Sequence, residues 1–254
     1  MTELIHLNCV KIVSPIRSNV CGHCLLLKEN ERLILIDTGI GLLDTLNPTE
    51  RIGQELISLV GYRFDENKTA LRQIEKLGLN PSLVSDCIIS HLDNDHIGGL
   101  ADFPNATVHI GAEEFENYNS GNSRYLKTPL SHNPVLKTYD KTDCNWFGFE
   151  GRKVETGTQA DLFLIPLFGH TFGHCGVAIK ANDKWVFYVG DAYYLKEELL
   201  NKNHPVNELA QIRADDNDLR IATLNKIRSL TKDHPEIGVY SYHDIEEFRP
   251  LSNQ

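Results

Sequence analysis

The sequence predicts a layered α/β domain. Short apolar runs rich in Val, Ile and Leu recur between turn residues, segments with the apolar spacing of a helix alternate with them, and a hairpin pattern stands near the start. The chain has 254 residues, of which 41% are hydrophobic and 24% are charged. This composition is typical of a globular protein with a sizeable core, and we predict one domain over residues 1–254.

The first half of the chain combines strands with one clear helix. "CLLLKEN" and "RLILIDTG" flank the polar turn "KENER", which predicts a hairpin that leads into the Asp-Thr-Gly loop at 37–39. "TALRQIEKLGLNP" has helical apolar spacing and ends at the stop residues Gly78 and Pro81. "VSDCIIS" predicts a buried strand that runs directly into His91, and "ATVHIG" predicts the next strand.

The second half repeats this alternation after a segment without a clear pattern. Residues 112–160 are the least regular part of the chain, and we predict an irregular insertion there, which in a compact domain is usually functional or mobile. "DLFLIPLFGH", "CGVAIK" and "WVFYVGD" predict strands, "DLRIATLNKIRSL" predicts an amphipathic helix, and "EIGVYSYHD" predicts a last strand.

Charge and composition exclude several classes of partner. The formal net charge is −10, with 25 Lys and Arg against 35 Asp and Glu, so nucleic acid and anionic membrane surfaces are not expected to bind. No signal peptide or membrane-spanning run of apolar residues is visible, and we predict a cytoplasmic protein. Six scattered cysteines indicate reduced thiols, and the spacing in "CGHC", Cys21 to Cys24, is expected to reflect core packing.

The stretch "SHLDNDHIGGL" concentrates ligand-type side chains directly after a predicted strand. Alternate side chains of an extended segment point the same way, so His91 and Asp93 can reach one point, while a turn at Asn94 directs Asp95 and His96 toward a neighbouring point. This spacing suits two metal ions better than one. The other interpretation is that the Asp-Asn-Asp run caps a helix at a strand-to-helix turn.

Three more candidate ligands follow three more predicted strands. His170 stands in "FGHTFGHCG", Asp191 in "YVGDAYY" and His243 in "YSYHD". Because each follows a short apolar strand, we expect all three at the same end of a sheet, close to the residues of "HLDNDH". Together these side chains would complete the coordination of two ions.

The order of these motifs resembles the metallo-β-lactamase-fold hydrolase superfamily. Its pattern is an Asp-Thr-Gly turn, then H-x-H-x-D-H, then a His, an Asp and a His at successive strand ends, and this chain has all five elements between Asp37 and His243. The resemblance implies an αββα sandwich of two mixed β-sheets flanked by helices. It also implies two divalent ions, with zinc as the first choice, that share a hydroxide.

The resemblance assigns a role to each candidate residue. One ion is held by His91, Asp93 and His170, and the other by Asp95, His96 and His243, with Asp191 bridging the two. Asp95 could also accept the proton during hydroxide attack. Asp37 and His174 are expected to orient ligands or tie loops.

Two local stretches resemble the N-acyl homoserine lactone lactonases. "GDAYYLKEEL" places Tyr194 three residues after the bridging Asp191, where a Tyr of that family contacts the lactone, and "YHDIEEF" resembles the lactonase ending. This implies a small-molecule ester or lactone substrate and a catalytic pair of Asp95 and Tyr194. We expect a monomer or homodimer. Thioesterases of the glyoxalase II type and β-lactamases are the alternative hydrolases.

The chain departs from the family pattern at one position. The second position of H-x-H-x-D-H is Asp93, which adds a negative charge and a harder ligand. As a ligand, Asp93 should favour manganese or iron and make the bound water less acidic. Two alternatives remain open: Asp93 only caps the helix or hydrogen-bonds a ligand, or the protein is a non-hydrolytic diiron redox protein or metal sensor.

Overall fold

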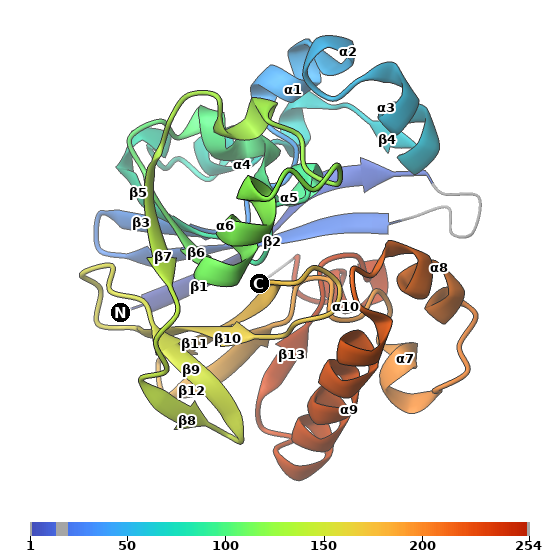
Figure 1. Ribbon diagram of the computed structural model, residues 1–254. Coiled ribbons are helices and arrows are strands. Elements are labelled where there is room, and N and C mark those ends of the chain that lie inside the picture. Colours follow the sequence, from blue (N-terminus) through green and yellow to red (C-terminus); the bar gives the residue numbers. More distant parts are fainter. Residues whose placement is uncertain (1, 14–19, 253–254) are drawn as a thin grey trace.

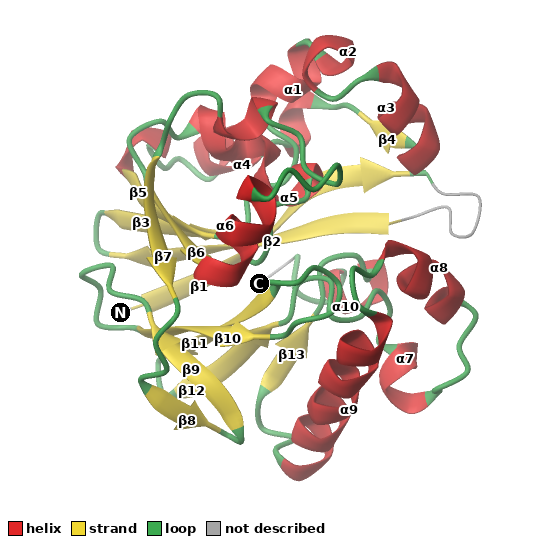
Figure 2. Cartoon of the chain, viewed as in Figure 1, coloured by secondary structure: helices red, strands yellow, loops and turns green. Residues whose placement is uncertain are grey.

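The computed structural model describes residues 2–13 and 20–252, so the terminal residues of the predicted domain 1–254 lie outside the described part. Two mixed β-sheets lie against each other, and helices cover their outer faces (Figures 1 and 2). Figure 1 shows α1, α2 and α3 beyond the first sheet and α7 and α9 beside the second. The αββα sandwich implied by the resemblance is confirmed. None of the helices over the described residues is long and apolar enough to cross a membrane.

The first sheet has seven strands in the order β4-β1-β2-β3-β5-β6-β7. The pairs from β4 to β3 are antiparallel and those from β3 to β7 are parallel. Its strands are β1 (Thr2–Ile12), β2 (Val20–Glu29), β3 (Arg32–Ile36), β4 (Tyr62–Arg63), β5 (Val84–Ile88), β6 (Thr107–Gly111) and β7 (Val135–Tyr139).

The second sheet has six strands in the order β13-β12-β11-β10-β9-β8. Among its described strands, β12 and β13 pair in parallel and the other neighbours pair antiparallel. Its strands are β8 (Cys144–Trp146), β9 (Phe149–Lys153), β10 (Asp161–Pro166), β11 (Cys175–Ala181), β12 (Lys184–Tyr188) and β13 (Gly238–Tyr240).

Helices and short 3-10 turns connect the strands. The helices are α1 (Leu42–Leu46), α2 (Pro48–Arg51), α3 (Gln54–Val60), α4 (Ala70–Lys76), α5 (Asn94–Ile97), α6 (Ala112–Asn119), α7 (Glu197–Leu200), α8 (Val206–Arg213), α9 (Asn217–Asp233) and α10 (Ile245–Phe248). The 3-10 turns are η1 (Glu66–Lys68), η2 (Pro81–Leu83), η3 (Gly98–Asp102) and η4 (Thr128–Leu130).

Local chemistry explains why the predicted elements form where they do. The hairpin of β2 and β3 turns at Asn30, whose positive φ of 56° is the conformation that Asn tolerates better than most residues. Helix α4 begins where the Thr69 hydroxyl accepts a hydrogen bond from the Arg72 N–H, and Gly78 adopts a φ of 75° just beyond its end. Helix α9 begins at Asp216, whose side chain caps Leu219.

The core lies mainly between the sheets. Consecutive residues of β2 and β3 are buried on both faces, and they pack with side chains of β10 and β11 such as Leu164 and Val177. A second cluster joins Phe187 of β12 to the apolar face of α9, including Leu224 and Ile227. The six cysteines are free thiols, and Cys21 and Cys24 are core residues, as predicted.

The segment 112–160 differs from the expected irregular insertion. It contains α6, η4, β7, β8 and β9, and it carries the chain from the edge of the first sheet to the edge of the second. The strand β7 is mostly exposed, so its sequence lacks the apolar alternation of a half-buried strand. Helix α6 and the turn region between α6 and η4 approach the candidate site, through Glu114 and Arg124 respectively.

Truncation of the core should measure how far stability depends on packing between the sheets. Leu35 of β3 is fully buried, so we expect Leu35→Ala to lower the free energy of unfolding by about 2 to 5 kcal/mol. Leu59→Ala is the control because this side chain is 77% exposed, and its effect should stay within about 0.5 kcal/mol. Urea unfolding measures both, and equal effects would contradict the assignment of the core.

Candidate metal centre

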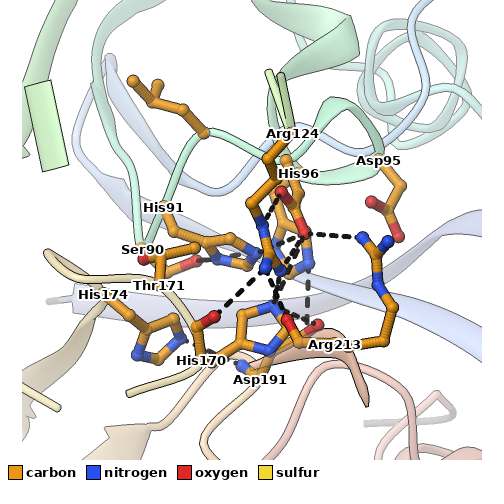
Figure 3. Close-up of polar contacts among 12 residues, drawn as sticks. Ser90, His91, Asp95, His96, Arg124, His170, Thr171, His174, Asp191 and Arg213 are labelled. Atoms are coloured by element: carbon orange, nitrogen blue, oxygen red, sulfur yellow. Dashed lines mark hydrogen bonds and ion pairs between the residues drawn. The ribbon is translucent and has the colours of Figure 1, made fainter. Parts of the chain in front are cut away.

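The candidate ligands meet where strand ends of both sheets converge. His91 follows β5 of the first sheet, while His170, Asp191 and His243 follow β10, β12 and β13 of the second. Strands β10, β12 and β13 run in the same direction, so their carboxyl ends share one edge, as the sequence predicted. Figure 3 shows His91, His96, His170 and Asp191 pointing toward a common centre.

These side chains form two groups of potential metal ligands. In each group the ligand atoms lie within 4.8 Å of one another; the first group is His91, His170 and Asp191, and the second is Asp95, His96 and His243. Asp191 lies close to both, because its two oxygens are 3.4 Å from Nε2 of His96, His170 and His243. Ligands on one tetrahedral ion with bonds of about 2.0 Å lie roughly 3.3 Å apart, so this spacing suits coordination.

Unpartnered buried atoms show that the residues fit metal ions. His91 Nε2, His96 Nε2 and Asp191 Oδ1 are buried and have no hydrogen-bond partner. The other ring nitrogens are held: His96 Nδ1 lies 2.8 Å from Asp37 Oδ2, and His243 Nδ1 lies 3.1 Å from the Cys21 carbonyl oxygen. When each Nδ1 donates to its acceptor, the lone pair of Nε2 faces the centre, as in metal-binding histidines.

Asp37 organises the second group from behind, as predicted. Its carboxylate accepts hydrogen bonds from the backbone N–H and hydroxyl of Ser90, from the Tyr188 hydroxyl, and from His96. Asp37 itself has a φ of 52°, a conformation that non-glycine residues adopt mainly where surrounding contacts impose it. It therefore joins β3, the end of β5 and β12 beneath the site.

His174 supports Asp191 without facing the ligand groups. Its Nδ1 donates to the Leu167 carbonyl oxygen at 3.1 Å, and its Nε2 accepts from the Asp191 N–H at 3.1 Å. Burial, with His170 close by, lowers the pKa of His174 to about 3, so the ring is neutral and can accept this bond. The predicted orienting role agrees with this geometry.

The second group attracts positive charge. Burial alone would lower the pKa of His96, but the carboxylates of Asp191 and Asp37 outweigh it and raise that pKa well above its ordinary value. The pKa of His243 is raised in the same way, against burial, by Asp191 and then Asp95. Carboxylates that favour protonated histidines also favour a bound cation.

Asp93 is engaged by an arginine that the sequence analysis did not identify. Arg124, in the turn after α6, donates from Nε to Asp93 Oδ1 at 2.6 Å and from Nη2 to Asp93 Oδ2 at 2.7 Å. Burial would raise the pKa of Asp93, but Arg124 outweighs it and holds that pKa well below the ordinary value. The charge that we expected Asp93 to add to the site is therefore paired within the protein.

The interpretation that the Asp93 side chain only caps the following helix is wrong. Asp93 occupies the position before α5, but its side chain makes no capping hydrogen bond to that helix. Its Oδ2 lies 3.5 Å from Nε2 of both His91 and His170, which places the carboxylate beside the first group. The structure therefore places the Asp93 carboxylate at the site, where Arg124 binds both of its oxygens.

Glu114 of α6 is a second residue that the sequence analysis missed. Its buried carboxylate accepts from the Leu92 N–H, the Tyr125 hydroxyl and the Thr171 hydroxyl, which are neighbours in sequence of His91, Arg124 and His170. Gly173 allows this approach, because any Cβ there would collide with the backbone of α6. One carboxylate therefore ties three segments of the site together.

Comparison with known proteins identifies the family. A model of the metallo-beta-lactamase superfamily matches residues 22–234. The chain belongs to this superfamily. Its members bind divalent metals, and the chain is accordingly a metallo-hydrolase, which favours the hydrolytic interpretation over the redox or sensing alternative.

Individual relatives agree with this assignment. Probable metallo-hydrolase Rv2300c of Mycobacterium tuberculosis is 33% identical over 96% of this chain and 81% of its own length. An N-acyl homoserine lactonase of a Bacillus species is 26% identical over 89% of this chain and 82% of its own length. The solved structure of an N-acyl homoserine lactone hydrolase with N-hexanoyl-L-homoserine at its metal centre superposes with a TM-score of 0.70 at 22% identity, covering 97% and 94% of the two chains.

The predicted site residues lie close together in the folded chain. The structure brings together the side chains predicted as ligands and the phenol predicted as catalytic: His91, Asp93, Asp95, His96, His170, Asp191, His243 and Tyr194. Their roles as ligands or catalytic groups stay predictions. His23, in contrast, is fully buried in β2 away from this centre, and its Nε2 lies 2.8 Å from Nδ1 of His6.

Glu114 should make stability depend on pH. Burial raises the pKa of Glu114 from 4.5 to about 7, so the folded protein holds this proton more strongly than the unfolded chain. The contribution of the neutral carboxyl is fully present below pH 4.5 and is lost as the pH rises through about 7. Glu114→Gln should remove this decline, which we estimate as a few kcal/mol between about pH 5 and pH 8.

The neighbouring Glu113→Gln is the matched control. Burial would raise the pKa of Glu113, but its ion pair with Arg152 lowers it below the ordinary value, so this variant should keep the decline near neutral pH. Urea unfolding across the pH range measures each difference from the wild type. A wild-type profile parallel to that of Glu114→Gln would show that Glu114 is not the group responsible.

Proposed function

We propose that this protein is a metal-dependent hydrolase of esters or lactones. The observation that carries the proposal is an apolar cavity of about 480 Å³ that opens on both ligand groups. Asp95, Asp191 and His243 lie in its wall beside Tyr194. The rest of the wall is mainly apolar and includes Ile12, Val20, Leu59, Val60, Leu195, Val206, Leu209 and Ile212.

The two ligand groups offer candidate sites for two divalent ions, with zinc as the first choice. His91, His170 and Asp191 would hold one, Asp95, His96 and His243 the other, and Asp191 lies where it could contact both. Ions held there would act as Lewis acids toward a carbonyl oxygen and lower the pKa of a bound water. Histidine and carboxylate ligands are those of catalytic zinc sites.

Tyr194 is placed to donate a hydrogen bond to the substrate. Its ring lies between two candidate ligands, 5.9 Å from the His170 ring and 5.5 Å from the His243 ring. Burial, and then Asp191, raise the pKa of Tyr194 above its ordinary value, so the phenol keeps its proton at neutral pH. A neutral phenol in this position can stabilise negative charge that develops on a carbonyl or leaving oxygen.

Asp95 is the candidate proton acceptor. Its carboxylate lies in the cavity wall, with Oδ2 3.7 Å from His243 Nε2. A carboxylate beside the position of the attacking water can accept its proton as the new bond to the carbonyl carbon forms. The apolar walls would meanwhile hold the non-reacting part of the substrate and limit access of bulk water.

An acyl lactone is the substrate that best fits this arrangement. The lactonase relatives act on a lactone that bears an acyl group, and the cavity offers an apolar wall for such a chain next to polar groups for the ring. Thioesters and β-lactams are the competing substrates. A screen of all three classes, with and without a chelator, tests the proposal. Chelator-sensitive turnover of lactones or esters is expected, whereas turnover of only thioesters or β-lactams would contradict it.

Removal of the Tyr194 hydroxyl should slow hydrolysis and leave metal binding intact. We expect Tyr194→Phe to lower kcat by roughly ten- to a thousandfold, the range that such donors contribute. Tyr193→Phe is the matched control, because the neighbouring phenol donates to Glu247 at 3.1 Å and is not part of the cavity wall. Steady-state kinetics and metal analysis on both variants measure the effects. An unchanged kcat in Tyr194→Phe would assign that residue to packing.

A further inference from the structure

Arg124 places a buried positive charge within the first ligand group. Besides its two bonds to Asp93, its Nη2 lies 2.6 Å from His170 Nε2, and its Nη1 donates to the carbonyl oxygens of His170 at 3.1 Å and Arg213 at 2.5 Å. The side chain is only 8% exposed. Figure 3 shows Arg124 reaching toward His170 and Asp191, while Arg213 approaches from the other side.

The contact with His170 excludes simultaneous coordination. A guanidinium only donates hydrogen bonds, so His170 Nε2 must accept through its lone pair. A zinc ion would need the same lone pair and would lie about 2.0 Å from that nitrogen. An imidazole nitrogen has one lone pair, and it serves either Arg124 or a metal ion, not both.

Asp93 stabilises the buried guanidinium of Arg124. Both of its oxygens are engaged by the planar fork of Arg124, a bidentate geometry that is among the strongest charged hydrogen bonds in proteins. Removing the guanidinium from this buried carboxylate would leave an uncompensated charge. Asp93, which stands where the family has its second histidine, therefore holds the positively charged side chain of Arg124 beside the first ligand group.

The second group has no such competitor. In the part of the chain that the structure describes, no arginine forms a hydrogen bond or an ion pair with Asp95, His96 or His243. His96 Nε2 is buried without a hydrogen-bond partner, and an oxygen of Asp191 lies 3.4 Å from it. The two groups thus differ in their readiness for a metal ion.

We propose that Arg124 is the resident cation of the first group. The protein then holds one divalent ion tightly, on Asp95, His96 and His243, and binds a second ion at His91, His170 and Asp191 only when Arg124 moves away. The inference rests on the ligand groups of the proposed function but concerns the number of ions. Asp93 is in this arrangement the counter-ion of Arg124 and not a metal ligand.

Zinc titration of the metal-free protein tests the proposal. We expect the wild type to bind about one zinc ion tightly per chain. In Arg124→Gln we expect the affinity of the second site for zinc to rise by at least about tenfold. Arg213→Gln is the matched control: it removes the same charge 3.5 Å from Asp93, but Arg213 forms no hydrogen bond to His170, so the second site should stay weak. Calorimetry and metal analysis after dialysis give the stoichiometry, and circular dichroism checks folding.

The wild-type chain gives an answer even if Arg124→Gln does not fold. His96→Ala should lose the tight ion, whereas His170→Ala should keep it, because the proposal assigns His170 to Arg124. Two equally tight ions in the wild type, or an unchanged second site in folded Arg124→Gln, would overturn the inference and leave the proposed function standing. Failure of the wild type to bind zinc at all would instead refute the ligand groups on which both proposals depend.

Discussion

Buried negative charge at the junction of the two sheets is the constraint on which the site depends. The loops that follow the strands bring Asp37, Asp93, Glu114 and Asp191 into the interior, where an unpaired carboxylate is costly. Each is stabilised differently. Asp37 accepts hydrogen bonds from Ser90, Tyr188 and His96. Asp93 pairs with Arg124. Burial raises the pKa of Glu114, so this carboxyl keeps its proton to higher pH. Asp191 lies beside His96, His170 and His243, and its negative charge there favours a bound cation.

The same contacts join the segments that carry the candidate ligands. Glu114 joins the segments that carry His91, Arg124 and His170, and Asp37 joins β3, the end of β5 and β12. Precise placement matters in a hydrolytic site, because small displacements of catalytic groups reduce rates strongly. The polar network beneath the candidate ligands, formed by Asp37 and Glu114 with their partners, therefore supports the proposed function by positioning these ligands.

The cavity and the centre together support the proposal of a substrate with an apolar and a polar part. Apolar side chains from β1, α3 and α8 make up much of the cavity wall, and Asp95, Asp191 and Tyr194 also line it. Such a division is typical of enzymes that bind an apolar group and react at an adjacent polar bond. The superfamily and its relatives make the chain a metallo-hydrolase, and the apolar lining of this cavity is the basis of our proposal that the substrate is an acyl lactone or ester.

The sequence by itself determined the α/β class and the candidate ligands, and the resemblance of its motifs to a known superfamily implied the fold family. Spacing in "HLDNDH" and the positions of His170, Asp191 and His243 after apolar strands are local patterns, and local periodicity is visible without the structure. Only the tertiary structure showed the partners of these residues. Arg124 is 31 positions from Asp93, and Glu114 is 57 from Thr171. Nothing in the chain near Arg124 marks it, because its role arises from the fold: an aspartate carboxylate buried between two sheets needs a cation, and the turn after α6 supplies it.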